Sequence, residues 1–177
     1  MIESMPEDGE PLISFILYVS ILYSAGSLAW GYLSYAGNGA VVFWIVTFGI
    51  FWLAAAWKRW RWVSTIGIVL ALPLAVIGLW LNIVAGWMFG GAIFALLAWD
   101  LTEFQRKMKF MPAREDIRGM ERRHLMRISL VTLIGLGLAS IFMLLRGQID
   151  TEWSLYVLSV GLLEALQMFG WLGRPKV

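Results

Sequence analysis

Glu164 is the acidic residue that lies deepest within an apolar run, and it offers this sequence its most distinctive chemistry. Gln167 follows one turn later on the same helical face. An ionised carboxylate at bilayer depth costs about 2.5–3.5 kcal/mol on insertion scales, so it should face a bundle interior or a water-filled cavity. No Lys, Arg or His lies within the predicted spans to neutralise it. Glu164 is therefore expected to be protonated, or to lie beside water, a bound cation or another subunit.

Two hydroxyl residues well inside other apolar runs, Thr47 and Thr132, are the neutral partners that we expect for this carboxyl group. Together with Glu164 and Gln167 they form the predicted ligand- or ion-binding site. The alternative is structural, because a protonated glutamic acid can join two helices through a hydrogen bond without binding anything.

Other catalytic chemistry is scarce. The chain has no cysteine and one histidine, His124, so thiolate metal sites, paired-histidine haem sites and thiol nucleophiles are excluded. Asp100 and Glu103, with Glu115 and Asp116, could supply carboxylates for a divalent metal at the cytoplasmic face. Nearby Lys and Arg residues, however, account for them as ordinary charge pairs. We therefore predict no metal, no cofactor and no enzymatic activity.

The elements that must position these residues are six apolar runs in a chain that is 60% hydrophobic and 15% charged, with a mean hydropathy of +0.74. Their approximate ranges are 11–33, 40–57, 62–81, 83–99, 128–145 and 153–173. A helix needs roughly 20 apolar residues to cross a bilayer, whereas barrel strands alternate apolar and polar residues. The sequence predicts an all-α integral membrane protein, with residues 1–177 forming a single six-helix transmembrane domain.

The turn between the third and fourth runs depends on Asn82, the residue that interrupts the apolar pattern there. Without a turn, residues 62–99 would form one helix about 57 Å long, nearly twice the thickness of the hydrocarbon layer. The chain is therefore expected to turn at residues 81–83.

Positive charge predicts the orientation. With six spans, thirteen of the fourteen Lys and Arg residues fall on one side, and Arg146 falls on the other. Because cytoplasmic loops are enriched in Lys and Arg, we predict a multi-pass protein of the cell membrane with both termini in the cytoplasm.

The loop at 100–127 is the largest predicted region outside the membrane. It is expected to be helical and to lie against anionic lipid headgroups. The arginines that we expect to contact lipid are Arg114, Arg118, Arg122, Arg123 and Arg127. Nucleic acid is not an expected partner, because these basic residues follow the membrane topology.

Small residues at helical spacing mark the helix contacts, since they let backbones approach closely within a membrane. The predicted contact residues are Ser20, Ser24, Ser27 and Gly31 in the first run, Gly86 and Gly90 in the fourth, and Gly135 and Ala139 in the fifth. Pro73 lacks an N–H and is expected to kink the third helix.

The sequence also contains eleven Trp residues, ten of which are expected at the two membrane boundaries, where indole is favoured. Trp52 is the most displaced toward the membrane core.

Two functions remain open. The first is transport or membrane-embedded binding of a proton, a cation or a small polar solute, using the midplane carboxylate Glu164. The alternative is a non-catalytic accessory subunit of a larger membrane complex. A homo-oligomer or other membrane subunits are the candidate protein partners.

Overall fold

The computed structural model describes residues 10–36, 39–58, 60–108, 117–147 and 151–172, with side chains for a subset of these residues. These residues form six α-helices and no strand, which confirms the all-α prediction. The helices are α1 (Glu10–Ala36), α2 (Gly39–Trp57), α3 (Arg61–Trp80), α4 (Ala85–Met108), α5 (Ile117–Arg146) and α6 (Thr151–Leu172).

Five of these helices, α1 to α5, contain segments that are long and apolar enough to cross a membrane. The segments are Ile13–Tyr35, Gly39–Trp57, Trp62–Trp80, Ala85–Lys107 and Arg123–Arg146. The chain is therefore a helical membrane protein. Side chains of α6 are described through Leu162, and its role as a sixth span remains a prediction.

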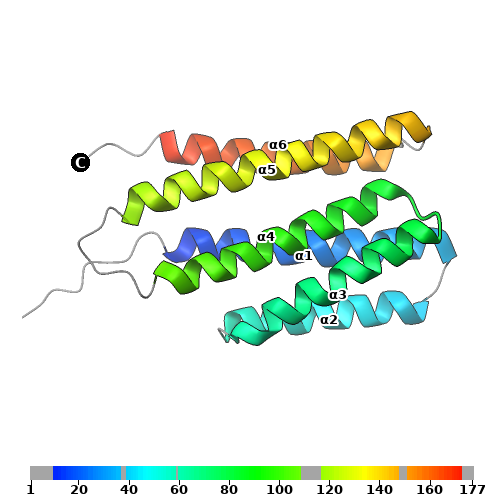
Figure 1. Cartoon of the computed structure of the whole chain (residues 1–177), viewed down its shortest axis with the longest axis horizontal. Coiled ribbons are helices and arrows are strands. Elements are labelled where there is room, and N and C mark those ends of the chain that lie inside the picture. Colours follow the sequence, from blue (N-terminus) through cyan, green and yellow to red (C-terminus); the bar gives the residue numbers. More distant parts are fainter. Residues whose placement is uncertain (1–9, 37–38, 59, 109–116, 148–150, 173–177) are drawn as a thin grey trace, which may run out of the picture.

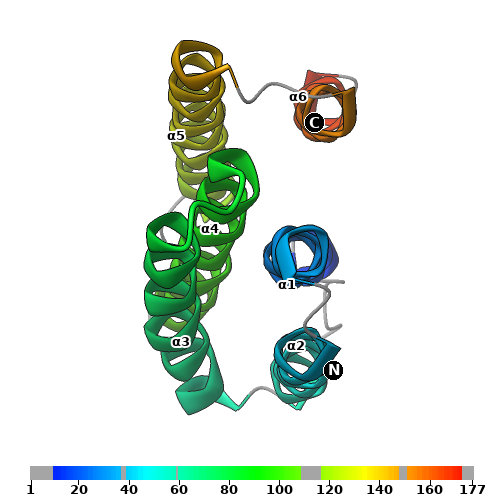
Figure 2. The ribbon, with the colours of Figure 1, turned by 90° about the vertical axis from the view of Figure 1, so that its right-hand side faces the viewer.

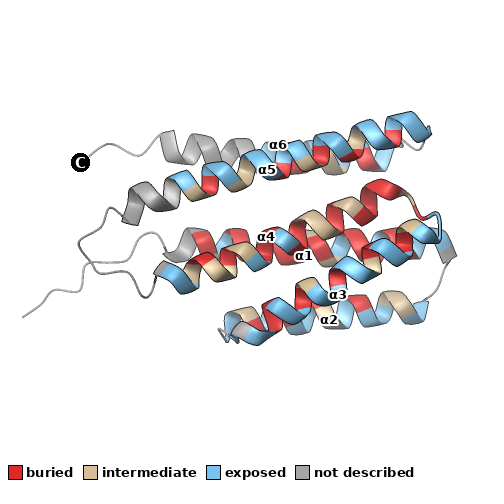
Figure 3. Ribbon diagram, viewed as in Figure 1, coloured by how far each residue is buried: buried red, intermediate tan, exposed pale blue. Residues whose placement is uncertain are grey.

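The helices form two layers of three, seen end-on in Figure 2. One layer holds α2, α1 and α6, and the other holds α3, α4 and α5. The middle helices, α1 and α4, pack against each other and are the most buried spans (Figure 3). By contrast, α2, α3 and α5 expose most of their apolar surface, as expected for helices that border lipid.

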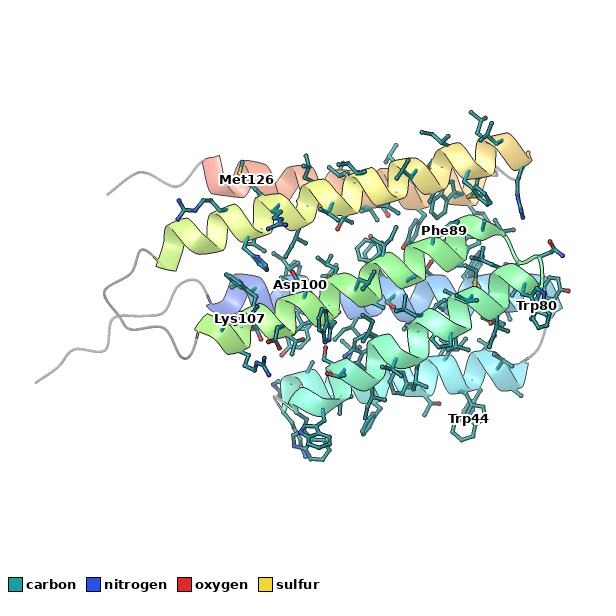
Figure 4. All side chains as sticks on the ribbon, viewed as in Figure 1. Trp44, Trp80, Phe89, Asp100, Lys107 and Met126 are labelled. Atoms are coloured by element: carbon teal, nitrogen blue, oxygen red, sulfur yellow. The ribbon has the colours of Figure 1, made fainter. Side chains whose placement is uncertain are left out.

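Successive helices run in opposite directions, so the connections fall at two ends of the bundle (Figure 1). We call one the basic end, which carries Lys58, Arg106, Lys107, Arg123 and Arg127 among the described residues. We call the other the turn end, where the α3–α4 turn lies. Lys107 and Trp80 mark the two ends in Figure 4.

The predicted turn between the third and fourth spans is confirmed. Asn82 adopts a left-handed backbone conformation with φ of 59°, which Asn tolerates better than most residues. The Ile83 N–H donates to the Gly78 carbonyl at 2.9 Å, and the Asn82 N–H donates to that of Leu79 at 3.1 Å. These bonds close the end of α3 and reverse the chain direction into α4.

Helix extends into both ends of the loop predicted at 100–127. Helix α4 continues to Met108 and α5 begins at Ile117, whereas residues 109–116 lie outside the described residues. Hydropathy marks the hydrocarbon layer, but a helix continues into water where its polar residues favour it. In α4 the exposed Arg106 pairs with Glu103 one turn earlier.

The arginines expected to contact lipid are only partly described. Arg123 and Arg127 are exposed on α5, while the side chains of Arg114, Arg118 and Arg122 lie outside the described residues. The positions 117–127 belong to α5 itself and do not form a separate helical piece.

Candidate functional site

The four residues of the predicted binding site occupy three helices. Glu164 and Gln167 belong to α6, but their side chains lie outside the described residues. Thr132 is buried on α5. Thr47 is exposed on α2, because the buried face of that helix is formed by other residues, including Trp52. Helices α2 and α6 lie on opposite sides of α1 (Figure 2), so the structure does not bring Thr47 beside α6.

The serine row of α1 faces α4. Ser24 Oγ donates to the Gly91 carbonyl at 2.9 Å, and Ser27 Oγ donates to the Trp87 carbonyl at 2.7 Å. Ser20 instead donates to the Ile16 carbonyl of its own helix at 2.8 Å. The hydroxyl protons of Ser24 and Ser27 therefore join α1 to α4.

Close packing also surrounds the small residues of the central helices. A Cβ atom on Gly31 would collide with the side chain of Met88, and one on Gly86 would lie 2.7 Å from the Trp153 ring. A Cβ on Gly90 would lie 2.9 Å from the Tyr156 hydroxyl oxygen.

Two other predicted packing residues lie on α5. Ala139 is buried, and a Cβ on Gly135 would lie 3.0 Å from Ile93 Cδ1 of α4. On α3, Pro73 is exposed inside a helix that continues from Arg61 to Trp80.

Two of the tryptophans predicted at the outer boundary, Trp87 and Trp153, lie in the first turns of α4 and α6. The two residues are 7% and 2% exposed, so both rings face the interior of the bundle. Their ring centroids are 5.8 Å apart, and Tyr156 lies within 5.3 Å of both rings. The neighbouring glycines of α4 have no side chain, so these rings can approach the α4 backbone closely. Because the rings pack on one another, this aromatic cluster is a filled contact rather than an open cage around a ligand.

Polar groups occur within and beside this aromatic cluster, at the interface of α1 with α6. Tyr23 Oη donates to Ser159 Oγ at 3.2 Å. Nearer the turn end, Trp30 Nε1 donates to the Glu152 carboxylate at 2.7 Å. The Tyr156 hydroxyl oxygen is buried over Gly90 of α4, beside Ser27 Oγ. The sequence analysis did not predict these contacts, because the periodicity of one helix does not show which other helix packs against it.

A second ionisable contact joins α4 and α5 near the basic end. His124 Nε2 lies 3.1 Å from Asp100 Oδ2, although the two groups are not aligned for a hydrogen bond. The His124 ring stacks on Phe104 with a centroid separation of 4.0 Å. Among the residues whose side chains are described, no group of three His, Asp or Glu residues could hold a metal.

We expect the Asp100–His124 contact to contribute no more than about 1 kcal/mol to the free energy of unfolding, because both side chains are partly exposed. A double-mutant cycle of Asp100→Asn and His124→Gln, followed by unfolding in mixed micelles, measures this coupling. Glu103→Gln is the matched control, since Glu103 pairs within its own helix. A coupling indistinguishable from zero would mean that the two groups are neighbours without a stabilising interaction.

Comparison with known proteins gives no relative: no family model, no curated protein and no solved structure matches the chain.

Proposed function

We propose that this membrane protein binds and moves a proton or a small cation at an intramembrane site built around Glu164. The inward face of α6 supports this proposal. Trp153 and Val160 are almost completely buried, and Tyr156 lies between them. At helical spacing, positions 164 and 167 continue this row by one and two further turns. We therefore infer that Glu164 and Gln167 occupy the face that α6 turns toward the bundle.

The pairing of α1 with α6 carries the proposal further. Trp30 bonds to Glu152, and Tyr23 bonds to Ser159, so seven residues separate the two contacts on each helix. The two helices run in opposite directions (Figure 1), and the equal spacing of the two contacts gives the register from which we extrapolate. Five residues beyond the second contact, Tyr18 on α1 comes level with Glu164 on α6. We therefore infer that Tyr18 lies next to the carboxyl group.

The chemistry of this site favours a positively charged ligand. Neither α1 nor α6 contains Lys, Arg or His, so these two helices supply no cation of their own to neutralise Glu164. A proton or a bound cation removes the cost of burying that charge. The phenol of Tyr18 could donate a hydrogen bond to the ionised form.

The orientation and lipid contacts complete the proposal. The basic end is proposed to face the cytoplasm, with both termini on that side, because Lys and Arg are retained there. Exposed Arg123 and Arg127 of α5 are proposed to contact anionic headgroups, as are Arg114, Arg118 and Arg122.

The test compares Glu164→Gln with the wild-type protein by thermal unfolding in micelles, over a pH series and in the presence of Na⁺, K⁺ or Mg²⁺. A ligand at 100 times its dissociation constant stabilises the folded state by about 2.7 kcal/mol. We expect the wild-type midpoint to depend on pH or on one cation, and Glu164→Gln to fold but lose that dependence. Glu103→Gln, which changes a carboxylate at the basic end, should keep it.

The opposite outcome favours the accessory-subunit alternative. If neither pH nor any of the three cations moves the wild-type midpoint, or if Glu164→Gln keeps the dependence, the carboxylate does not form the site. The exposed apolar faces of α2, α3 and α5 would then be examined for other membrane subunits by native mass spectrometry.

A further inference from the structure

The short connection between α2 and α3 lies at the basic end of the bundle, among exposed indole rings. The segments of α2 and α3 that are apolar enough to cross a membrane leave only residues 58–61 between them. Trp57, Trp60 and Trp62 are 79%, 56% and 85% exposed. Indole rings are favoured in the headgroup layer, where the ring is buried and its N–H stays hydrated. These three side chains therefore place the connection among lipid headgroups.

Positive charge lies in the same connection. Lys58 is exposed, and its Nζ lies 6.0 Å from the centroid of the Trp60 ring. Among the residues whose side chains are described, no carboxylate pairs with Lys58. The sequence adds Arg59 and Arg61 to this connection, although their side chains lie outside the described residues. A lysine at headgroup depth binds a phosphate as a point charge, while an adjacent indole contacts the apolar groups below it.

Helix α4 brings a further cation to the same depth. Ser64 Oγ of α3 donates to Thr102 Oγ1 of α4 at 3.1 Å, and the two helices run in opposite directions. Trp60 lies four residues before Ser64, and Arg106 lies four residues after Thr102, so Trp60 and Arg106 come level. Residues at i and i+4 share a helical face, so Arg106 is on the face of α4 that packs against α3. At this end α4 extends beyond α2 and α3 (Figure 1).

Arg106 is available to an anion although it pairs with Glu103 of its own helix. Its side chain is half-exposed, and a guanidinium has five N–H donors, more than one carboxylate oxygen can accept. The cations of α2 and α4 thus flank the exposed indoles at one depth. We call this group the boundary patch, and its described members are Trp57, Lys58, Trp60, Trp62 and Arg106.

We propose that the boundary patch binds the headgroup of an anionic phospholipid, with the phosphate held between Lys58 and Arg106. The indoles lie against the glycerol backbone and the first part of the acyl chains. A lipid fits this patch better than a soluble anion, because the apolar faces of α2 and α3 that border lipid begin directly below it. The site does not depend on Glu164. It is also separate from the arginines of α5, since α4 lies between α3 and α5 (Figure 2).

A fluorescent probe beside the patch reports which lipid occupies it. The natural chain has no cysteine, so Thr65→Cys can be labelled alone. Thr65 is exposed on α3, one turn from Trp62 on the same face. The labelled full-length protein is placed in nanodiscs that contain equal amounts of phosphatidylglycerol and phosphatidylcholine. One of the two lipids carries bromine in its acyl chains, which quenches a nearby probe, and the experiment is repeated with the other lipid brominated.

We expect brominated phosphatidylglycerol to quench the probe more strongly, with a relative affinity on the order of tenfold over phosphatidylcholine. Lys58→Gln combined with Arg106→Gln should make the two lipids quench equally. Lys58→Arg combined with Arg106→Lys keeps both charges and should keep the preference. The matched control is Lys107→Gln combined with Arg127→Gln, which removes two charges near His124, on the α5 side of α4, and should also keep it.

Equal quenching by the two lipids in the protein with an intact patch would overturn the proposal. So would a preference that survives Lys58→Gln with Arg106→Gln, or one that the control pair abolishes to the same extent, because the attraction would then be a property of the whole basic end. Glu164→Gln should leave the quenching unchanged. The result is therefore independent of the cation-dependent unfolding test of the function proposed above.

Discussion

Met88→Ala is expected to lower the free energy of unfolding by about 2–5 kcal/mol, among the largest effects of any single substitution in the bundle. The Met88 side chain is fully buried on α4 and fills the space above two glycines, Gly31 of α1 and Gly78 of α3. Truncation therefore removes contacts among three helices at once. Unfolding in mixed micelles measures the loss, and Leu96→Ala on the exposed face of α4 is the matched control.

A compensating change distinguishes a cavity from a general loss of folding. A Cβ atom on Gly78 would collide with Met88 Sδ, so Gly78→Ala overpacks the wild-type interface. In the Met88→Ala background the same methyl group enters vacated space, and we expect the double variant to be more stable than Met88→Ala alone. Gly137→Ala, where the added atom meets open space, controls for helix propensity. Strict additivity of Met88→Ala and Gly78→Ala would contradict this packing account.

The sequence predicted the helices well because the bilayer imposes their length and composition. Asn82 was sufficient to locate the α3–α4 turn, since an unbroken helix would have exceeded the membrane thickness. Hydropathy alone marks where the apolar part of α4 ends and that of α5 begins, at about residues 99 and 128, whereas the helices themselves reach Met108 and start at Ile117. Glu103 and Arg106 are polar residues beyond the apolar part of α4, yet the helix continues through them. The pattern of apolar residues thus locates the apolar part of a helix, but it does not show where the polar continuation of that helix ends.

Contacts between helices were less accessible to sequence reasoning. Trp87 and Trp153 lie in the first turns of α4 and α6, and the sequence did not show that their rings pack inside the bundle, beside the glycines of α4. Thr47 lies well inside its apolar run, as expected of a residue that contacts the bound ligand, but its side chain is on the exposed face of α2. Depth follows from position along a helix, whereas the direction of a side chain depends on which helix lies beside it. The Trp30–Glu152 pairing, 122 residues apart, required the folded arrangement.

Gly86→Val should weaken the attachment of α5 and α6 to the rest of the bundle. A Cβ atom at this position of α4 would collide with Met143 of α5 and would lie 2.7 and 2.8 Å from two atoms of the Trp153 ring of α6. Met143 can change rotamer, but the indole is rigid and 2% exposed, so the helices must separate. Overpacking of this kind costs about 1–3 kcal/mol.

The matched control is Gly137→Val on α5, where an added Cβ meets no atom within 4 Å. Thermal unfolding of both variants in the same micelles separates the collision from the intrinsic effect of valine in a helix. We expect Gly86→Val to lower the midpoint and Gly137→Val to leave it nearly unchanged. Adding Trp153→Ala should relieve part of the Gly86→Val defect, because it removes the rigid ring that the new side chain meets. Equal midpoints for Gly86→Val and Gly137→Val would contradict this account. They would show that α4 does not approach α6 closely at Gly86, and that the aromatic cluster does not fix the position of α6.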